Sequence, residues 1–219
     1  MSLRQFNTVI KGATIYDGKG EDPYCADVGI RGEKIAAIGN LNTDGANVIE
    51  AAGLSLMPGI IDVHTHYDAQ ITWDPTLSPS PSMGVTTAVM GNCGFGIVPC
   101  PPEHQEIMLK NLSVVEGMNL KTLLEGTQWK FETFPEYIKY LDEQRPHANV
   151  AVLIGHSAVR TAVMGSESST RINPTEAELD AMSFIVDEAL AHGAIGFASS
   201  FSPNHSGYGG RPMPSTIAK

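Results

Sequence analysis

Residues 57–93 read MPGIIDVHTHYDAQITWDPTLSPSPSMGVTTAVMGNC and carry the strongest structural signal in the chain. Their first part, residues 59–63, is short, apolar and β-branched, which is typical of a strand buried in a parallel sheet. His64 and His66 follow directly, and residues two apart in an extended chain point to the same side. The sequence therefore predicts two imidazoles that project together from the carboxyl end of a buried strand, as in a metal-binding pair.

A second apolar run, residues 85–90, predicts a neighbouring buried strand that leads into Cys93. A thiolate beside two imidazoles is a good ligand set for zinc, and the soft sulfur argues against magnesium or calcium. We therefore predict that His64, His66 and Cys93 form a Zn²⁺ site.

The motifs PGIIDVHTHYD, WDP, GVTT and GNCGFG resemble the metal-dependent amidohydrolase superfamily, and within it the N-acyl-D-amino-acid deacylase (D-aminoacylase) group. The first motif is shared across the superfamily, whereas GNCG after GVTT is much narrower. The resemblance continues through EGMNL, FETFPEY, IGHSAVR and GAIGFASS, so it covers nearly the whole chain. It implies a (β/α)₈ barrel beside a small β-domain and amide hydrolysis with zinc. It also implies that His64 and His66 are the strand-one metal pair and that Cys93 takes the place of the carboxylated lysine of many relatives.

The predicted fold class is α/β, with a small β-sandwich subdomain over residues 1–55 and the first half of the barrel over residues 56–219. Short alternating runs with Gly, Asp and Asn between them predict that the first part is antiparallel, with a hairpin turn at residues 31–34. A complete barrel needs about 250 residues, and this chain has 219. We expect a fragment with about four βα units, whose later histidine ligands and catalytic aspartate lie beyond Lys219.

The remaining elements follow from hydrophobic periodicity and capping signals. We expect helices over 103–115, 134–144 and from a Thr175 cap to Gly193, strands over 149–154 and 194–199, a rigid proline-rich loop over 67–83, and irregular chain over 116–132. The last helix carries one apolar stripe that is expected to be buried, formed by Leu179, Met182, Ile185, Val186, Ala189 and Leu190.

Three residues are candidates for substrate binding. His156 follows a predicted strand, where barrel enzymes carry functional groups, and is either a metal ligand, a substrate contact, or a histidine hydrogen-bonded behind the ligands. His205 and Arg211 lie in the loop SFSPNHSGYGGRPMPS and either contact the anionic end of a substrate or only hold the loop. This loop departs from the best-known D-aminoacylases, which leaves the substrate open.

Five other side chains carry two interpretations each. Tyr67, Asp68 and Trp73 either line a pocket or fill the core of their loop. Arg160 and Arg171 either attract a substrate carboxylate or are solvated surface arginines, which is the commoner case.

Composition excludes several classes of function. The net charge of −10 discourages binding to nucleic acid or to anionic membranes, and no long apolar run or signal peptide is present in the sequence. Three cysteines form no disulfide pattern, with Cys25 expected to be a small buried residue and Cys100 a spectator. We expect a soluble cytoplasmic protein that takes a small-molecule amide and forms either a homo-oligomer or a complex with a complementary C-terminal half.

The predicted activity is zinc-dependent hydrolysis of linear amides through metal-activated water, with a carboxylate that moves the proton. One alternative is a cyclic amidohydrolase of the hydantoinase or dihydroorotase kind, against which Cys93 argues. Another is a catalytically silent fragment, whose histidines are structural or which needs a partner chain.

Overall fold

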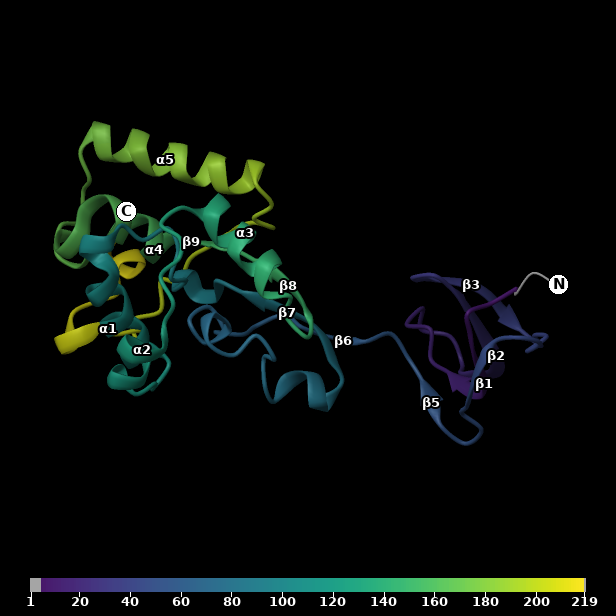
Figure 1. The fold of residues 1–219 in the computed structure, drawn as a ribbon. Coiled ribbons are helices and arrows are strands. Elements are labelled where there is room, and N and C mark those ends of the chain that lie inside the picture. The colour runs from purple at the N-terminus through teal and green to yellow at the C-terminus, as the bar shows by residue number, and fades with distance from the viewer. Residues whose placement is uncertain (1–4, 219) are drawn as a thin grey trace. The chain divides into compact units, whose positions relative to one another are not determined.

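The computed structural model describes residues 5–218 and divides into two compact units, one up to Gly59 and one from Ile60 (Figure 1). The first is a β-unit, and the second contains the described helices and two sheets whose strands all run parallel. We describe each unit by itself.

The first unit is a five-stranded sheet in which four strands run in the order β3-β2-β1-β4, while β5 also pairs with β1. Its strands are β1 (Thr8–Ile15), β2 (Tyr24–Arg31), β3 (Lys34–Gly39), β4 (Asn47–Glu50) and β5 (Ser55–Leu56). The predicted hairpin is confirmed, since Arg31 pairs with Lys34 across the turn. The prediction of an antiparallel unit is wrong for β4 and β5, which run parallel to β1. The reason is that the chain after β3 crosses from one edge of the sheet to the far side of β1 before it re-enters.

The second unit is built on parallel strands, namely β6 (Ile60–Asp62), β7 (Val85–Met90), β8 (Asn149–Val152), β9 (Ile154–Gly155) and β10 (Phe197–Ala198). One sheet has the order β6-β7-β8, and β9 pairs with β10 in a second sheet. Leu153 links them, because its N–H donates to Met90 O at 2.9 Å between β8 and β9. The carboxyl ends of these parallel strands therefore lie along one edge, where α/β folds place their functional groups.

Two strand predictions need correction. The predicted burial of residues 59–63 is wrong: β6 is an edge strand paired only with β7, and 48% of Ile60 and 60% of Ile61 remain exposed. The strand expected over 149–154 is interrupted at Leu153. Within the one expected over 194–199 only β10 is regular strand, although Ile195 and Gly196 also hydrogen bond to Val152 and Ile154. In both cases the apolar pattern located the strand but not the partner that defines its pairing.

Helices surround these strands, with bounds α1 (Gln105–Val115), α2 (Leu120–Gly126), α3 (Phe134–Gln144), α4 (His156–Met164) and α5 (Glu176–Ala191). The sequence analysis missed α2 within the supposedly irregular segment, although Asn119 caps it by accepting the N–H of Thr122. It also missed α4, which begins at His156 directly after β9. None of the helices that the structure describes combines the length and the apolar character needed to cross a bilayer.

Capping boxes fix the starts of α3 and α5. At α3 the hydroxyl of Thr133 accepts the Glu136 N–H, and at α5 Thr175 does the same for Glu178, whose carboxylate accepts the Thr175 N–H in return. The buried stripe on α5 is only partly confirmed, because Leu179 and Leu190 are 44% and 46% exposed. In the described residues α5 packs against α3 and α4 along one narrow face.

Short 3₁₀ turns fill the connections, at Gln70–Thr72, Ser80–Met83, Asn92–Gly94, Pro102–His104, Gly165–Ser169, Tyr208–Gly210 and Pro214–Ile217. The core of the second unit lies between the strands and α1 to α3, and its largest fully buried side chains include Tyr137, Phe134, Met90, Leu109 and Leu112. This core holds α1 rigidly beside the carboxyl ends of the strands.

Candidate metal centre

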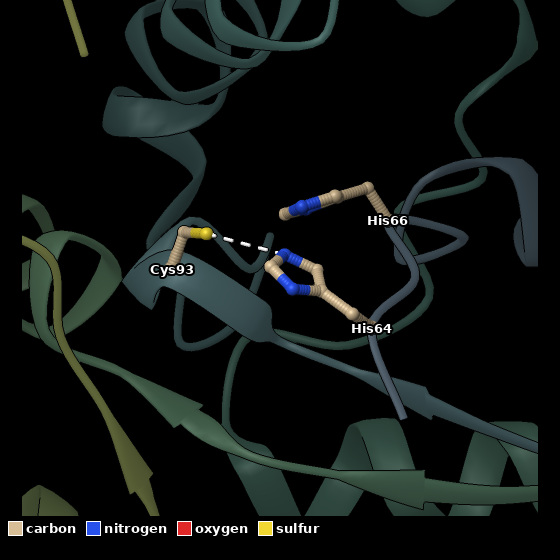
Figure 2. A group of neighbouring side chains, drawn as sticks. All are labelled: His64, His66 and Cys93. Carbon is tan, nitrogen blue, oxygen red and sulfur yellow. Dashed lines mark hydrogen bonds between the residues drawn. The ribbon is translucent and has the colours of Figure 1, made fainter. Parts of the chain in front are cut away.

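Three metal-ligating side chains converge at the carboxyl ends of β6 and β7. His64, His66 and Cys93 each offer one ligand atom, and these atoms all lie within 4.8 Å of one another. His64 Nε2 is 3.3 Å from Cys93 Sγ, and the two imidazole centroids are 5.3 Å apart (Figure 2). The structure thus brings together the three residues that the sequence analysis selected.

The histidine segment is tied to β7 beyond the end of β6. The backbone N–H of Thr65 donates to Val89 O at 3.0 Å, and its hydroxyl donates to the same carbonyl at 2.7 Å. Asp62 accepts the N–H of His64 at 3.2 Å. These bonds fix the backbone on both sides of His64 and hence the direction in which its ring projects.

A tight left-handed turn presents the thiol. Gly91 has a φ of +79° and Cys93 has a φ of +55°, a region that non-glycine residues seldom occupy. The backbone also passes very close to the next strand, since a Cβ on Gly91 would lie 2.1 Å from Leu153 O. Asn92 closes the turn by donating its side-chain amide to Val89 O at 2.9 Å.

A second close approach lies on the other side of the thiol. A Cβ on Gly155, the last residue of β9, would lie 2.8 Å from both the carbonyl carbon and the oxygen of Gly94. The turn that bears Cys93 is therefore packed backbone to backbone against the strand that leads into His156.

Burial favours the uncharged forms of two of the three candidate ligands, His66 and Cys93. It lowers the pKa of His66 to about 4, with the neighbouring His64 and His205 adding to the shift. Burial, together with the nearby Glu116, raises the pKa of the Cys93 thiol. A metal ion would therefore meet a neutral imidazole at His66 and would have to displace the proton of the Cys93 thiol.

Glu116, at the end of α1, is a site residue that the sequence analysis missed. Its Oε1 lies 3.3 Å from His66 Nδ1, and burial raises the pKa of its carboxyl. The available signal was its position: it opens the EGMNL motif, immediately after a helix that was correctly expected to end at residue 115.

Asp68 is fully buried behind the histidine pair. Burial raises the pKa of its carboxyl to about 7, although backbone N–H groups, including that of Gly91, act in the opposite direction. Its Oδ2 has no hydrogen-bond partner among the described residues, and the Tyr137 hydroxyl donates instead to the Asp68 backbone carbonyl at 3.0 Å. Of the two interpretations of Asp68, its burial favours the loop core over a pocket lining.

The donor set fits zinc. Tetrahedral zinc with Zn–N of about 2.1 Å and Zn–S of about 2.3 Å has an N···S edge of roughly 3.6 Å, close to the 3.3 Å between His64 Nε2 and Cys93 Sγ. Zinc also prefers nitrogen and sulfur donors, such as two imidazoles and a thiol, to a set of oxygen donors alone. A cavity of about 320 Å³ opens beside the histidines and is lined by Asp62, Tyr67, Gln70, Ser80, Glu116 and Met118, among others.

His156 and His205 lie near this centre without belonging to the group of three. His156 Nδ1 is 2.8 Å from the hydroxyl of Ser199, and burial lowers the pKa of His156. His205 Nδ1 is 2.8 Å from the hydroxyl of Ser200, and its ring meets that of Phe95 edge-on at 4.9 Å. Both histidines are held by serines on the segment that follows β10.

The three arginines that were considered as substrate contacts lie in environments different from that of the candidate metal centre. Arg211 lines a separate cavity of about 640 Å³ beside α1 and the loop around Tyr208. Arg160 is buried, contrary to the commoner case of a surface arginine, and donates to the carbonyl of Arg171 at 2.8 Å. Arg171 forms a bidentate pair with Glu178, whose pKa this pair lowers to about 2. Arg171 is therefore already neutralised by a carboxylate of the chain itself.

Comparison with known proteins places these features in a family. The D-aminoacylase of Alcaligenes xylosoxydans xylosoxydans is 35% identical over 195 residues, which cover 89% of this chain and 37% of the enzyme. A crystal structure of D-aminoacylase matches with a TM-score of 0.76 and 34% identity, and one study of that enzyme describes a binuclear metal centre. The N-acyl-D-glutamate deacylase of Bordetella bronchiseptica, solved with zinc and a phosphonate inhibitor, matches with a TM-score of 0.74 and 32% identity.

Both solved structures cover 98% of this chain, and the chain spans 40% of each of them. The model of the amidohydrolase family matches residues 47–203, which include all three residues of the candidate metal centre. The chain belongs to the amidohydrolase family.

Proposed function

We propose that this chain supplies the metal-binding part of a zinc-dependent hydrolase of linear amides, of the N-acyl-D-amino-acid deacylase kind. The observation that carries the proposal is the convergence of His64, His66 and Cys93 at the ends of two adjacent parallel strands, with 3.3 Å between Nε2 and Sγ. The family match and the deacylase relatives support it.

The candidate ligands would contribute to zinc binding in different ways. His64 and His66 would hold zinc through neutral imidazoles, which burial provides for His66 by lowering its pKa to about 4. Cys93 would lose its proton when zinc binds and contribute the negative charge. When bound, zinc supplies Lewis acidity, which polarises an amide carbonyl and makes water acidic near pH 7.

We further propose that His156 and His205 face the substrate. Each ring has its Nδ1 occupied by a serine hydroxyl, which would leave its Nε2 free to contact an acyl oxygen or a carboxylate. The role of Arg211 in substrate binding stays a prediction without a supporting contact. It lines a different cavity from the one beside His64 and His66, as do His156 and His205. The residue that moves the proton is not assigned among the described residues.

The parallel strands support an interpretation as the first units of a (β/α)₈ barrel, with the domain division at about residue 55. They share one direction, and the candidate ligands lie at their carboxyl ends, as in barrel enzymes. The β-sandwich nature of the first unit, the small amide substrate and any homo-oligomer or complementary chain stay proposals.

The first test is elemental analysis of the purified 219-residue chain, followed by hydrolysis assays. We expect near-stoichiometric zinc in this chain. Release of D-amino acids from N-acetyl-D-glutamate, N-acetyl-D-aspartate or N-acetyl-D-methionine, with the L-isomers as controls, would support the deacylase assignment. Opening of a hydantoin or of dihydroorotate instead would favour the cyclic-amide alternative. Absence of zinc from a folded chain would sink the proposal for a metal centre.

A further inference from the structure

The second nitrogen of His66 is buried beside a carboxylate. His66 Nδ1 lies 3.3 Å from Glu116 Oε1, the side chains of both residues are only 18% exposed, and the nitrogen has no hydrogen-bond partner in the described structure. The distance between Nδ1 and Oε1 is near that of a hydrogen bond, but the groups are not aligned as a hydrogen bond requires. A buried ring nitrogen that lacks a partner is unfavourable. If it carries the proton, rotation of the ring toward Glu116 supplies an acceptor for that proton.

Glu116 is well placed to hold a ring in one orientation. It is the C-terminal cap of α1, where its N–H donates to Leu112 O at 3.0 Å, and Leu112 is in the buried core. Its carboxylate lines the cavity that also contains both histidines. A rigid helix end thus fixes the carboxylate relative to His66.

Glu116 does not belong to the ligand group itself. The set of described ligand atoms that approach within 4.8 Å contains His64, His66 and Cys93 only. Within this site Glu116 Oε1 lies beside Nδ1 of the His66 ring. Carboxylates that orient metal-bound histidines occupy this position next to the ring nitrogen that does not bind the metal.

We propose that Glu116 is a positioning residue that accepts the Nδ1–H of His66 and so holds the imidazole in the tautomer whose Nε2 is free for zinc. This inference rests on the proposed function, because it gives His66 the role of a zinc ligand. A neutral imidazole carries its proton on one nitrogen only, so fixing that proton on Nδ1 determines which nitrogen can bind a metal.

The test compares E116A and E116Q with E106A, which removes a carboxylate from the same helix. Glu106 is a matched control, because its side chain is 67% exposed and pairs with Lys110 on the surface. Two quantities are measured: the ¹⁵N chemical shifts of the His66 ring in the metal-free chain, which report its tautomer, and the zinc dissociation constant by competition with a chelator.

In the unsubstituted chain we expect the Nδ1–H tautomer of His66. In E116A we expect a mixture of tautomers and zinc binding about 10- to 100-fold weaker. E116Q keeps an amide oxygen that can accept the same hydrogen, so its loss should be smaller, and E106A should change neither quantity. A similar His66 tautomer and zinc affinity in E116A and the unsubstituted chain would overturn the inference, as would equal losses in E106A and E116A.

The two proposals can fail separately. If the unsubstituted chain takes up no zinc, the proposed function fails, and the metal-free tautomer comparison alone decides whether Glu116 orients His66. If zinc binds fully and E116A and E116Q leave the His66 tautomer unchanged, the metal centre stands and the positioning role of Glu116 is wrong.

Discussion

Cys93 Sγ lies 3.3 Å from His64 Nε2, although the two residues are 29 positions apart in the chain. The contact exists because β6 and β7 are parallel neighbours and each delivers its side chain just beyond its carboxyl end. Neither residue could reach the other from an antiparallel pair of the same strands, since the two ends would then lie at opposite edges.

Removal of the imidazoles tests the metal centre. The double substitution His64→Ala, His66→Ala should reduce bound zinc to less than a tenth of one equivalent, because only the thiol of the group remains. The control is His192→Ala, which removes an exposed histidine at the end of α5 and should leave the zinc content unchanged. Zinc content is measured by plasma mass spectrometry after gel filtration, and full occupancy in the double variant would contradict the site.

Three cysteines with three degrees of exposure provide an internal comparison. The predicted burial of Cys25 is wrong, because this residue is exposed. Cys93 is intermediate, and Cys100 is buried with its pKa raised to about 12. Alkylation by iodoacetamide at pH 8, followed by peptide mass spectrometry, should therefore modify Cys25 fastest and Cys100 slowest.

Addition of zinc should slow alkylation of Cys93 at least about tenfold, because ligation withdraws the thiolate from reaction. The rate at Cys25 serves as the reference and should not change. Equal protection of both thiols would show general tightening of the fold instead of ligation.

The turn before Cys93 predicts a steric effect on stability. Gly91→Ala should lower the free energy of unfolding by about 1–3 kcal/mol more than Gly209→Ala, because the new methyl would meet Leu153 O. Gly209 is the matched control, since it has a similar φ of +69° and open space around it, so that it reports the backbone cost alone, about 1–2 kcal/mol. Urea unfolding measures both, and equal losses would refute the close approach.

Asp68 predicts a pH dependence of stability. Its pKa of about 7 in the folded chain exceeds the ordinary value of 3.8, so between pH 4 and pH 7 the folded state holds a proton that the unfolded state releases. The free energy of unfolding must therefore fall through this range as pH rises, by at most about 1.4 kcal/mol per pH unit from this group.

Asp68→Asn should remove that fall, so the variant should gain stability relative to the unsubstituted chain as pH rises from 4 to 7. His66 acts in the opposite direction, because its pKa is lowered from 6.5 to about 4 and stability is lost as pH falls through that window. It is present in both chains and cancels in the difference. Parallel pH profiles, measured by urea unfolding in a chelator, would contradict the prediction.

The sequence predicted the site better than it predicted the packing around it. His64, His66 and Cys93 could be placed together because strand patterns and the parallel direction suffice to align strand ends. Glu116 could not, because the contact depends on where α1 ends in space relative to His66, which no local pattern encodes. The cap at Thr175 was visible for the opposite reason, since all its atoms lie within four residues.

The two errors in expected burial have a common cause. The burial expected of Ile60 and Ile61, like the stripe positions Leu179 and Leu190, depends on what covers a face and not on the face itself. An apolar pattern predicts which side of a helix or strand will be buried. The element that covers this side, and how much of it is covered, are determined by the rest of the fold.

The backbone contact between Gly94 and Gly155 has a consequence for laboratory evolution of this region. A Cβ at Gly155 would lie 2.8 Å from the Gly94 backbone. Almost no other residue can therefore replace glycine at this position, even one whose side chain would favour a new substrate. Randomised libraries that aim to change selectivity would lose most of their members if they included residues 91, 94 and 155. Diversity directed to the exposed non-glycine positions of the 201–211 loop would keep more folded variants. Its glycines are best left unchanged, because a Cβ on Gly207 would lie 2.8 Å from Asn111 Oδ1 and Gly209 and Gly210 have positive φ.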